Sequence, residues 1–584
     1  MEYLETDILV VGGGTGGTAA ALQAARCGVD TIIVSEVPRL GGMLTSAGVV
    51  APDGNELVAF QTGIWGAFLR SLQERQPGGL NNGWVSIYTY HPRTGAEILA
   101  DWVQELSNLH WIKNQTPLEV LRQNHRVIGV KFADFVIKAK ITLDGTELGD
   151  LLPLAEIPYR WGWELKKEFN EPSAPESFNQ FTTKYPVQAP TWVVILQDYG
   201  KDGVAPKIPL PPNYNPENFT GAWDNYGSEK FLNYGRLPAN LFMLNWPIFG
   251  NDYGVNLNRL IESETAKKEL LQEAYYHSQG FAYFIQNELG RRYGLAQNIF
   301  PDNSAFALHP YYRESRRIQG ETTITENDII PVNSVSSNTF ITSSSITTAP
   351  LKIDTIAIGN YPNDHHYPNI QFPLKSKSIR WGGRCTGTPF TIPYHSLIPS
   401  SIEGFIACEK NISVSHIANG CTRLQPVVMN IGQAAGMAAA LCVKFNCQPR
   451  ELDVRKLQEA LLTDSFAPAA IIPLFNLPPQ HPDWLFWQLY YLNNPDAYPF
   501  DGNCPCKNID FIEHNYNFYQ GIFLRNNYQD YSIIIEQQPW QLITLNPQVN
   551  EQLLDYPTGK LIEVWGDLNY GGNWLVVEGI MNNE

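Results

Sequence analysis

The chain of 584 residues is long enough for about two to four domains, and its 43% hydrophobic and 17% charged content is typical of folded rather than disordered proteins. The 41 Lys and Arg residues stand against 58 Asp and Glu, and the resulting net charge of −17 argues against nucleic acid as a main partner.

The sequence shows no signal for export or membrane insertion. The N-terminus lacks a basic stretch followed by an apolar stretch and a cleavage site, so we expect no signal peptide. The longest apolar run, 431–443, is interrupted by Gly432, Gln433 and Gly436, and we expect it to be too short and broken to span a bilayer. Eight cysteines, mostly scattered and without metal or redox spacing, favour a reducing cytoplasm.

The first 36 residues predict a β-α-β unit. DILVV (7–11) is an apolar run typical of a buried parallel strand. The Ala-rich stretch 16–27 predicts a helix that ends at Gly28, and TIIVSE (31–36) predicts the second strand. A crossover of about 30 residues is the size that a dinucleotide-binding unit needs.

A glycine fingerprint lies in the turn of this unit. Gly12 permits the tight turn, Gly14 lets a pyrophosphate approach the backbone, and Gly17 lets helix and strand pack closely. The phosphates would lie at the helix N-terminus, which begins near Thr15. Glu36 ends the second strand, where its carboxylate can accept hydrogen bonds from ribose hydroxyls. The alternative is a plain glycine-rich turn with a surface carboxylate.

The segment after Glu36 distinguishes FAD from NAD. VPRLGGMLTSAGV resembles the stretch of FAD-dependent oxidoreductases in which two glycines let the chain turn along the cofactor. This resemblance implies FAD as the cofactor and adds Arg39, Gly41, Gly42 and Met43 to the predicted cofactor-binding residues.

Further elements follow in chain order. We expect a helix at 95–107, short strands over 110–143, a long helix at 263–291, strands 352–359 and 403–408 returning to the first sheet, and helices 425–445 and 452–462. Beyond 465, strands such as 531–535 and 561–566 predict a β-rich appendage. The predicted fold is α/β: a Rossmann-like FAD-binding domain in two parts, 1–157 and 351–464, an inserted α+β substrate or cap region, 158–350, and a C-terminal appendage, 465–584.

Several separated blocks resemble one family. They include LGGMLTSAGV (40–49), DGTELGDLLPLAEIPYRWG (144–162), NWPIFGNDY (245–253), YYRESRRIQGETTITENDI (311–329) and KNISVSHIANGCTRLQPVVMNIGQAAGMAAA (410–440). The chain resembles the FAD-dependent oxidoreductases that are distantly related to fumarate reductase and succinate dehydrogenase flavoproteins. The resemblance covers about residues 5–462 and implies that Asp144 binds the cofactor.

The chain departs from the family pattern at two places. Asp144-Gly145-Thr146 stands where relatives commonly show Asp-Ala-Thr. Glu409-Lys410-Asn411 replaces the expected Gly-Arg, in a stretch that the resemblance places near the FAD ribityl or pyrophosphate.

The later blocks contain the candidates for chemistry. Helix 425–445 would point its N-terminus, with Gln425, at the flavin, or else serve packing alone. His416 offers acid/base chemistry and Arg423 can hold a carboxylate, unless they form a turn cap and a structural ion pair.

Two further candidates come from the charged block and the His pair. Arg316 would bind an anionic substrate or the flavin, unless its block is a salt-bridged face. His366 could face the flavin as a base, although a structural role is the alternative, and its pair with His365 lacks a third metal ligand, so we predict no metal.

The class of enzyme is narrowed by missing motifs. The sequence contains no second nucleotide fingerprint for NAD(P)H and no redox-active Cys pair. The predicted function is oxidation of a small organic substrate by hydride transfer to flavin, with oxygen or another acceptor reoxidising it. A monooxygenase-type enzyme reduced by external NAD(P)H and a non-catalytic FAD-binding protein are the alternatives, and homo-oligomerisation is left open.

Overall fold

The computed structural model describes residues 2–332, 348–507 and 517–581. Part of the expected inserted region, 333–347, therefore lies outside the described residues.

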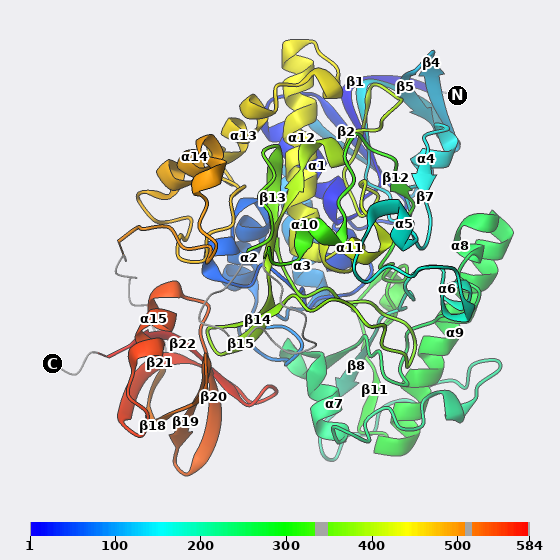
Figure 1. Ribbon diagram of the computed structural model, residues 1–584. Coiled ribbons are helices and arrows are strands. Elements are labelled where there is room, and N and C mark those ends of the chain that lie inside the picture. The colour runs from blue at the N-terminus through cyan, green and yellow to red at the C-terminus, as the bar shows by residue number, and fades with distance from the viewer. Residues whose placement is uncertain (1, 333–347, 508–516, 582–584) are drawn as a thin grey trace.

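A mainly parallel sheet forms the centre of the molecule (Figure 1). Its strands lie in the order β3-β2-β1-β6-β5-β4, and β17 pairs with the end of β6. Their bounds are β1 Glu2–Val11, β2 Thr31–Ser35, β3 Leu109–Lys113, β4 Glu119–Gln123, β5 Arg126–Lys131, β6 Phe135–Asp144 and β17 Phe405–Ala407. All neighbours pair in parallel except β4 with β5 and β5 with β6. The predicted α/β class is confirmed, and the arrangement is consistent with a Rossmann-type domain.

The register of this sheet brings three strand ends to one edge. Val11 at the end of β1 pairs with Asp144 at the end of β6, and Asp144 pairs with Ala407 at the end of β17. Ligands of open α/β sheets bind outside the carboxyl ends of the strands. The three segments that leave these strands therefore meet at the edge where a ligand is expected.

Two helices cross closely beside the sheet. α1 (Thr15–Arg26) packs against α12 (Gln425–Phe445), which begins and ends at the predicted positions. A Cβ atom on Gly432 would lie 2.1 Å from the carbonyl oxygen of Gly16, and one on Gly436 would lie 2.2 Å from that of Ala20. Larger side chains at these positions would push the helices apart. Helices α2 (Gly63–Arg75), α3 (Pro92–Gln104) and α13 (Val454–Leu462) complete this layer.

The apolar run 431–443 lies within α12, so the expectation that it is too short and broken to span a bilayer is wrong. Its glycines lie inside one continuous helix of 21 residues, and α12 is the one helix of the described residues long and apolar enough to cross a membrane. However, 89% of its most apolar window is buried within the protein. It is therefore a core helix, consistent with the expectation of no membrane span.

One predicted strand does not join the central sheet. The stretch predicted at 352–359 forms β13 (Thr355–Asn360), which pairs antiparallel with β16 (Pro389–Pro393) in a separate sheet. The prediction is wrong for this strand and right for 403–408, which returns as β17. The edge of β6 is taken by β5 over its first half and by β17 at its end, so β13 packs against α12 instead.

The inserted region contains a four-stranded antiparallel sheet and a long helix, seen in green in Figure 1. The sheet order is β11-β8-β10-β9, with β8 Val194–Asp198, β9 Arg236–Leu237, β10 Leu241–Leu244 and β11 Tyr293–Leu295. The long helix is α9 (Glu264–Leu289), close to its predicted span. Shorter elements are α4 Leu151–Leu154, β7 Tyr159–Arg160, α5 Lys166–Phe169, α6 Gln180–Lys184, α7 Ser228–Tyr234, α8 Arg259–Glu262, β12 Arg317–Ile318 and α10 Glu326–Ile329.

The C-terminal part forms a closed five-stranded barrel in the order β18-β19-β20-β22-β21. Its elements are β18 Asn517–Asn527, β19 Asp530–Ile535, β20 Gln538–Ile543, α15 Pro547–Asp555, β21 Leu561–Asn569 and β22 Trp574–Ile580. The barrel rests on the hairpin of β14 (Ser378–Trp381) and β15 (Arg384–Gly387), because Thr544 N donates to Gly382 O at 2.7 Å and Gln541 Nε2 donates to Gly383 O at 2.7 Å. Figure 1 shows the barrel beside the inserted region.

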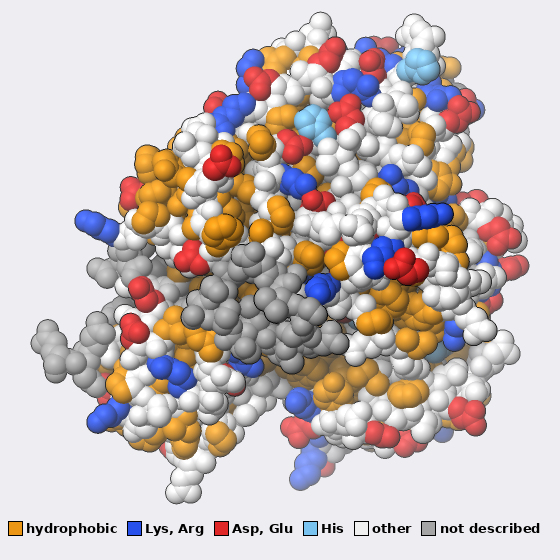
Figure 2. Space-filling view, in the orientation of Figure 1, with side chains coloured by type: hydrophobic (Ala, Val, Ile, Leu, Met, Phe, Trp, Pro, Cys, Tyr) orange, Lys and Arg blue, Asp and Glu red, His pale blue; other side chains and the backbone are white. Residues whose placement is uncertain are grey.

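One helix between the core and the barrel is apolar on its outer face. α14 (Trp484–Asn493) carries no charged residue, and Leu485, Phe486 and Tyr490 are exposed. Apolar side chains gather on the surface over this helix in Figure 2.

Candidate functional site

The turn between β1 and α1 and the segment around Gly41 and Gly42 form one unit. The Thr15 hydroxyl donates to the Gly41 carbonyl oxygen at 2.8 Å, and Gly41 N donates to Gly13 O at 3.0 Å. The structure therefore brings together the predicted cofactor-binding residues Gly12, Gly14, Thr15, Gly17, Gly41, Gly42 and the buried Met43. Helix α1 and strand β2 separate the two turns in the sequence, but hydrogen bonds hold the turns together in the fold.

The backbone of this unit fits a dinucleotide phosphate. A Cβ atom on Gly42 would lie 2.7 Å from Thr15 N and 2.8 Å from Gly14 Cα, so side chains here would fill the space in front of the helix. Gly16 N already donates to a carboxylate oxygen of Glu409 at 2.6 Å. A helix N-terminus with free N–H groups attracts anions, and here it holds one from the protein itself.

Both departures from the family pattern lie at this point. A Cβ atom on Gly145 would lie 2.5 Å from Gly17 Cα, so alanine would force β6 and α1 apart. The buried Lys410 ammonium lies 2.9 Å from Glu409 Oε1 and 2.5 Å from Glu147 Oε2. Burial raises the pKa of Glu409 to about 7 although Lys410 opposes this.

The Asp144 side chain forms its hydrogen bonds within the turn that follows β6. Its Oδ1 accepts hydrogen bonds from Thr146 N at 3.0 Å and from the Thr146 hydroxyl at 2.6 Å. Its other oxygen, Oδ2, is buried without a hydrogen-bond partner among the described residues. Burial raises the pKa of Asp144 to about 7.

Glu36 lies at the end of β2, in a strongly charged surrounding. The Glu36 side chain is exposed. Nevertheless, the surrounding protein atoms displace water from its carboxylate, and together with the nearby Asp150 charge this raises the pKa of Glu36 to about 7. Arg316, a predicted catalytic residue, forms an ion pair with Asp150 at 3.0 Å. Asp150 is the carboxylate whose charge acts on Glu36. Arg39 donates to Ile299 O at 2.8 Å, and its Nη1 is buried without a partner among the described residues.

The start of α12 faces a second polar cluster. Arg423 lies just before this helix, and its guanidinium donates to the Tyr311 hydroxyl at 2.6 Å and to Asp364 O at 3.0 Å. Gln425, the first residue of α12, accepts a hydrogen bond from Asp53 N at 3.4 Å. Burial and the nearby Glu56 carboxylate raise the pKa of Asp53 to about 7.

His366 lies between two carboxylates of this cluster. Its Nε2 is 2.7 Å from Asp364 Oδ2, and its Nδ1 is 3.2 Å from Asp252 Oδ2. Burial and Arg313 would lower the pKa of His366, but Asp364 and Asp252 raise it above its ordinary value. Burial would raise the pKa of Asp252, but Arg313, 3.1 Å away, and His366 hold it low.

His416 is fully enclosed. Its Nδ1 lies 2.8 Å from Glu314 Oε1, its Nε2 lies 2.7 Å from the Tyr367 hydroxyl, and its ring contacts Trp163. Burial and the Arg317 charge lower its pKa to about 3. Because the side chain of His416 is 0% exposed, a catalytic role for it stays a prediction that this geometry does not favour.

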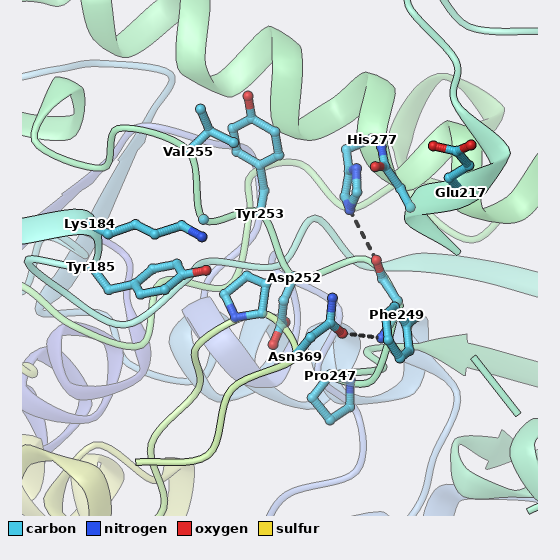
Figure 3. Close-up of a pocket in the computed structure, with 14 residues that line it drawn as sticks. Lys184, Tyr185, Glu217, Pro247, Phe249, Asp252, Tyr253, Val255, His277 and Asn369 are labelled. Carbon is cyan, nitrogen blue, oxygen red and sulfur yellow. Dashed lines mark hydrogen bonds between the residues drawn. The ribbon is translucent and has the colours of Figure 1, made fainter. Parts of the chain in front are cut away.

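A pocket of about 350 Å³ in the inserted region opens next to the His366 cluster. Figure 3 shows Lys184, Tyr185 and Asp252 at its wall, with His277 of α9 on the other side. Asp252 therefore belongs both to the pocket wall and to the cluster. A second cavity, of about 370 Å³, is lined by Asp364, His365 and the segment 371–378.

Sequence reasoning missed Asp53, Asp252, Arg313 and Asp364. Three of them stood in stretches already singled out: Asp252 in NWPIFGNDY, Arg313 in YYRESRRIQGE and Asp364 beside the His pair. Asp53 lies between Pro52 and Gly54 in the stretch 49–57, which resembles an ordinary turn and was a weak signal. The pairing of these charges across the fold could not be read from their positions in the chain.

Comparison with known proteins identifies the family. The profile of the family described as FAD dependent oxidoreductase matches residues 7–461. The chain belongs to this family. FAD is therefore its cofactor, and the glycine-rich unit at the start of α1 is suited to hold the FAD pyrophosphate.

The chain is also similar to several solved structures. A geranylgeranyl bacteriochlorophyll reductase-like protein from Thermoplasma acidophilum is 12% identical, with a TM-score of 0.31, over 79% of this chain and 84% of that one. A 3-ketosteroid-Δ4-(5α)-dehydrogenase from Rhodococcus jostii is 12% identical, with a TM-score of 0.17, over 24% of this chain and 45% of that one. A flavin-dependent brominase is 15% identical, with a TM-score of 0.22, over 36% and 48%.

Proposed function

We propose that this flavoprotein oxidises a small organic substrate by hydride transfer to FAD, and that oxygen or another acceptor reoxidises the flavin. The observation that supports this most is the cluster before α12, in which His366 lies between Asp364 and Asp252 beside the buried Arg423. Enzymes that remove a hydride from an alcohol or amine also need a group that takes a proton. An imidazole held by a carboxylate is suited to that task.

Each residue of the cluster has a defined part in this proposal. FAD, when bound, supplies the acceptor for the hydride, which carries both electrons. Asp364 Oδ2, on a side chain that is 40% exposed, takes the proton that leaves the substrate and passes it to His366 Nε2, 2.7 Å away. Arg423, which is buried, lies 3.4 Å from Asp364 and balances the charge of this carboxylate beside His366.

The other two predicted catalytic residues take different parts. We place Arg316 at the cofactor end, where it neutralises Asp150 near Glu36. His416 positions Tyr367 and Glu314 and does not contact substrate, because its side chain is 0% exposed whereas that of His366 is 15% exposed. Gln425 links the start of α12 to Asp53, whose raised pKa makes it a second candidate for proton transfer.

Anaerobic titration of the purified flavoprotein tests this function. Small alcohols, amines and hydroxy acids are added while the flavin absorbance is followed. Bleaching by one of these donors is the expected result. Bleaching by NAD(P)H alone would instead indicate a monooxygenase-type enzyme, and no bleaching by any donor would indicate a protein that holds FAD without catalysis.

We also propose a cytoplasmic location and a small molecule as the main partner. All eight cysteines are free, which suits a reducing compartment, and the net charge of −17 disfavours nucleic acid. A disulfide found in the protein purified from its host would contradict the first proposal.

A further inference from the structure

The cluster at the N-terminus of α1 is unusual for a phosphate site. Two carboxylates, Glu147 and Glu409, share the single ammonium group of Lys410. When all three groups are ionised, the cluster carries a net charge of −1. The pyrophosphate of FAD brings further negative charge to the same helix N-terminus.

Both carboxylates point into the space that the glycines keep open. Glu409 Oε2 accepts from Gly16 N at 2.6 Å, so it uses one of the free N–H groups of α1. Glu147 Oε1 lies 2.4 Å from where a Gly42 Cβ would be, the same position that lies 2.7 Å from Thr15 N. This oxygen is buried without a hydrogen-bond partner among the described residues.

We propose that Glu147, Lys410 and Glu409 are FAD-binding residues and that the cluster takes up one proton when the cofactor binds. The proton neutralises one of the two carboxylates. Lys410 then balances the other, so the cluster no longer adds negative charge beside the pyrophosphate. The proposal depends on the cofactor and not on the reaction proposed above.

The surroundings of the cluster support proton uptake. Burial raises the pKa of Glu409 to about 7, with Lys410 opposing and Glu147 adding to the rise. Other titratable groups nearby are His309, whose pKa burial lowers so that it stays neutral, and Asp144, whose pKa is about 7. A pyrophosphate placed here raises the pKa of Glu409 further, because like charges disfavour ionisation.

The sign of the pH effect follows from linkage. Above about pH 7 the free protein has lost the proton that the complex keeps, so binding must take one up. The dissociation constant of FAD therefore rises by up to about tenfold for each pH unit above 7 and changes little below pH 6.

The test measures FAD bound to the full-length protein by ultrafiltration of diluted holoenzyme between pH 6 and 8.5. The slope of log Kd against pH gives the number of protons. The wild-type slope is expected to approach one above pH 7. Glu409→Gln, which retains an acceptor for Gly16 N–H, and Glu147→Gln are each expected to flatten it.

Glu578→Gln is the matched control, since burial also raises the pKa of this carboxylate to about 7 but it lies on β22 of the barrel. It should keep the wild-type slope. A wild-type slope of zero, or an unchanged slope in both cluster variants, overturns the proposal. The wild-type measurement decides even where a variant fails to fold.

Discussion

The two ends of the site are built in different ways. The cofactor end uses backbone: glycine turns after β1 and around Gly41, placed by the register of one sheet. The other end uses side chains from the inserted region and from two later segments, and pairs their charges in the interior: Asp252, Arg313, Asp364 to His366, and Arg423. The cofactor end depends on the local conformation of the backbone, whereas the side-chain end forms only when distant parts of the chain have folded together.

The most complete loss is expected at the cofactor end, where the flavin itself would be lost. Gly14→Asp would place a Cβ 2.7 Å from Gly145 O and add a charge beside Glu409. We expect at least about a 100-fold loss of FAD affinity, or about 2.7 kcal/mol, and no flavin absorbance in the purified protein. Gly200→Asp, with no atom within 4 Å of its Cβ, is the control and should keep FAD. A flavin-replete Gly14→Asp protein would show that α1 does not bind the cofactor.

The second prediction concerns the side-chain end. His366→Gln should slow flavin reduction by the active donor by about 10²–10⁴-fold while FAD stays bound. Because the pKa of His366 is raised, its base form appears only as pH rises, so the wild-type rate should increase through that pKa. Stopped-flow reduction across pH measures both effects. His110→Gln, an exposed histidine on β3, should change neither, and a variant that keeps the rate and its pH profile removes His366 from the mechanism.

The third prediction compares buried and exposed ion pairs. Asp252 and Arg313 have side chains only 2% and 1% exposed, so Asp252→Asn leaves a buried guanidinium without its counter-charge. We expect the free energy of unfolding to fall by about 3–5 kcal/mol. Glu119→Gln breaks a pair whose side chains are 57% and 35% exposed and should cost under about 1 kcal/mol. Denaturant unfolding measures both, and equal losses would mean that the Asp252 pair is not buried in solution.

The smallest effect is the pH dependence due to His416. Its folded pKa of about 3 lies below the unfolded value of about 6.5, so the unfolded chain binds the extra proton between these values. Stability is therefore lost as pH falls from about 6.5, by about 2 kcal/mol at pH 5.

His416→Gln should reduce the difference in unfolding free energy between pH 7 and pH 5. His395→Gln is the matched control with the opposite sign, because its hydrogen bond to Asp354 raises the pKa of His395, and its contribution to stability is lost as pH rises. An unchanged difference in the His416 variant would mean that this ring is not kept neutral by burial.

Much of the cofactor end could be predicted because its signals are local. Periodicity located α1, β2 and α12 closely and the end of β1 but not its start at Glu2, and the glycines at 12, 14 and 17 have a physical reason that depends only on nearby backbone. The strand at 355–360 was misplaced for a nonlocal reason: β5 and β17 already occupy the edge of β6. Sequence patterns report a strand but not the edge that is free to pair with it.

The sequence by itself determined the α/β class, the dinucleotide turn and the family, because each rests on short-range spacing or on motifs in order. Only the tertiary structure decided which charges meet: His366 lies between Asp252 and Asp364, His416 is enclosed, and Glu409 reaches the N-terminus of α1. Pairing of charges across hundreds of residues depends on packing, which no local pattern encodes. The sequence therefore offers a larger set of candidate site residues, and the tertiary structure selects a smaller set whose side chains contact one another.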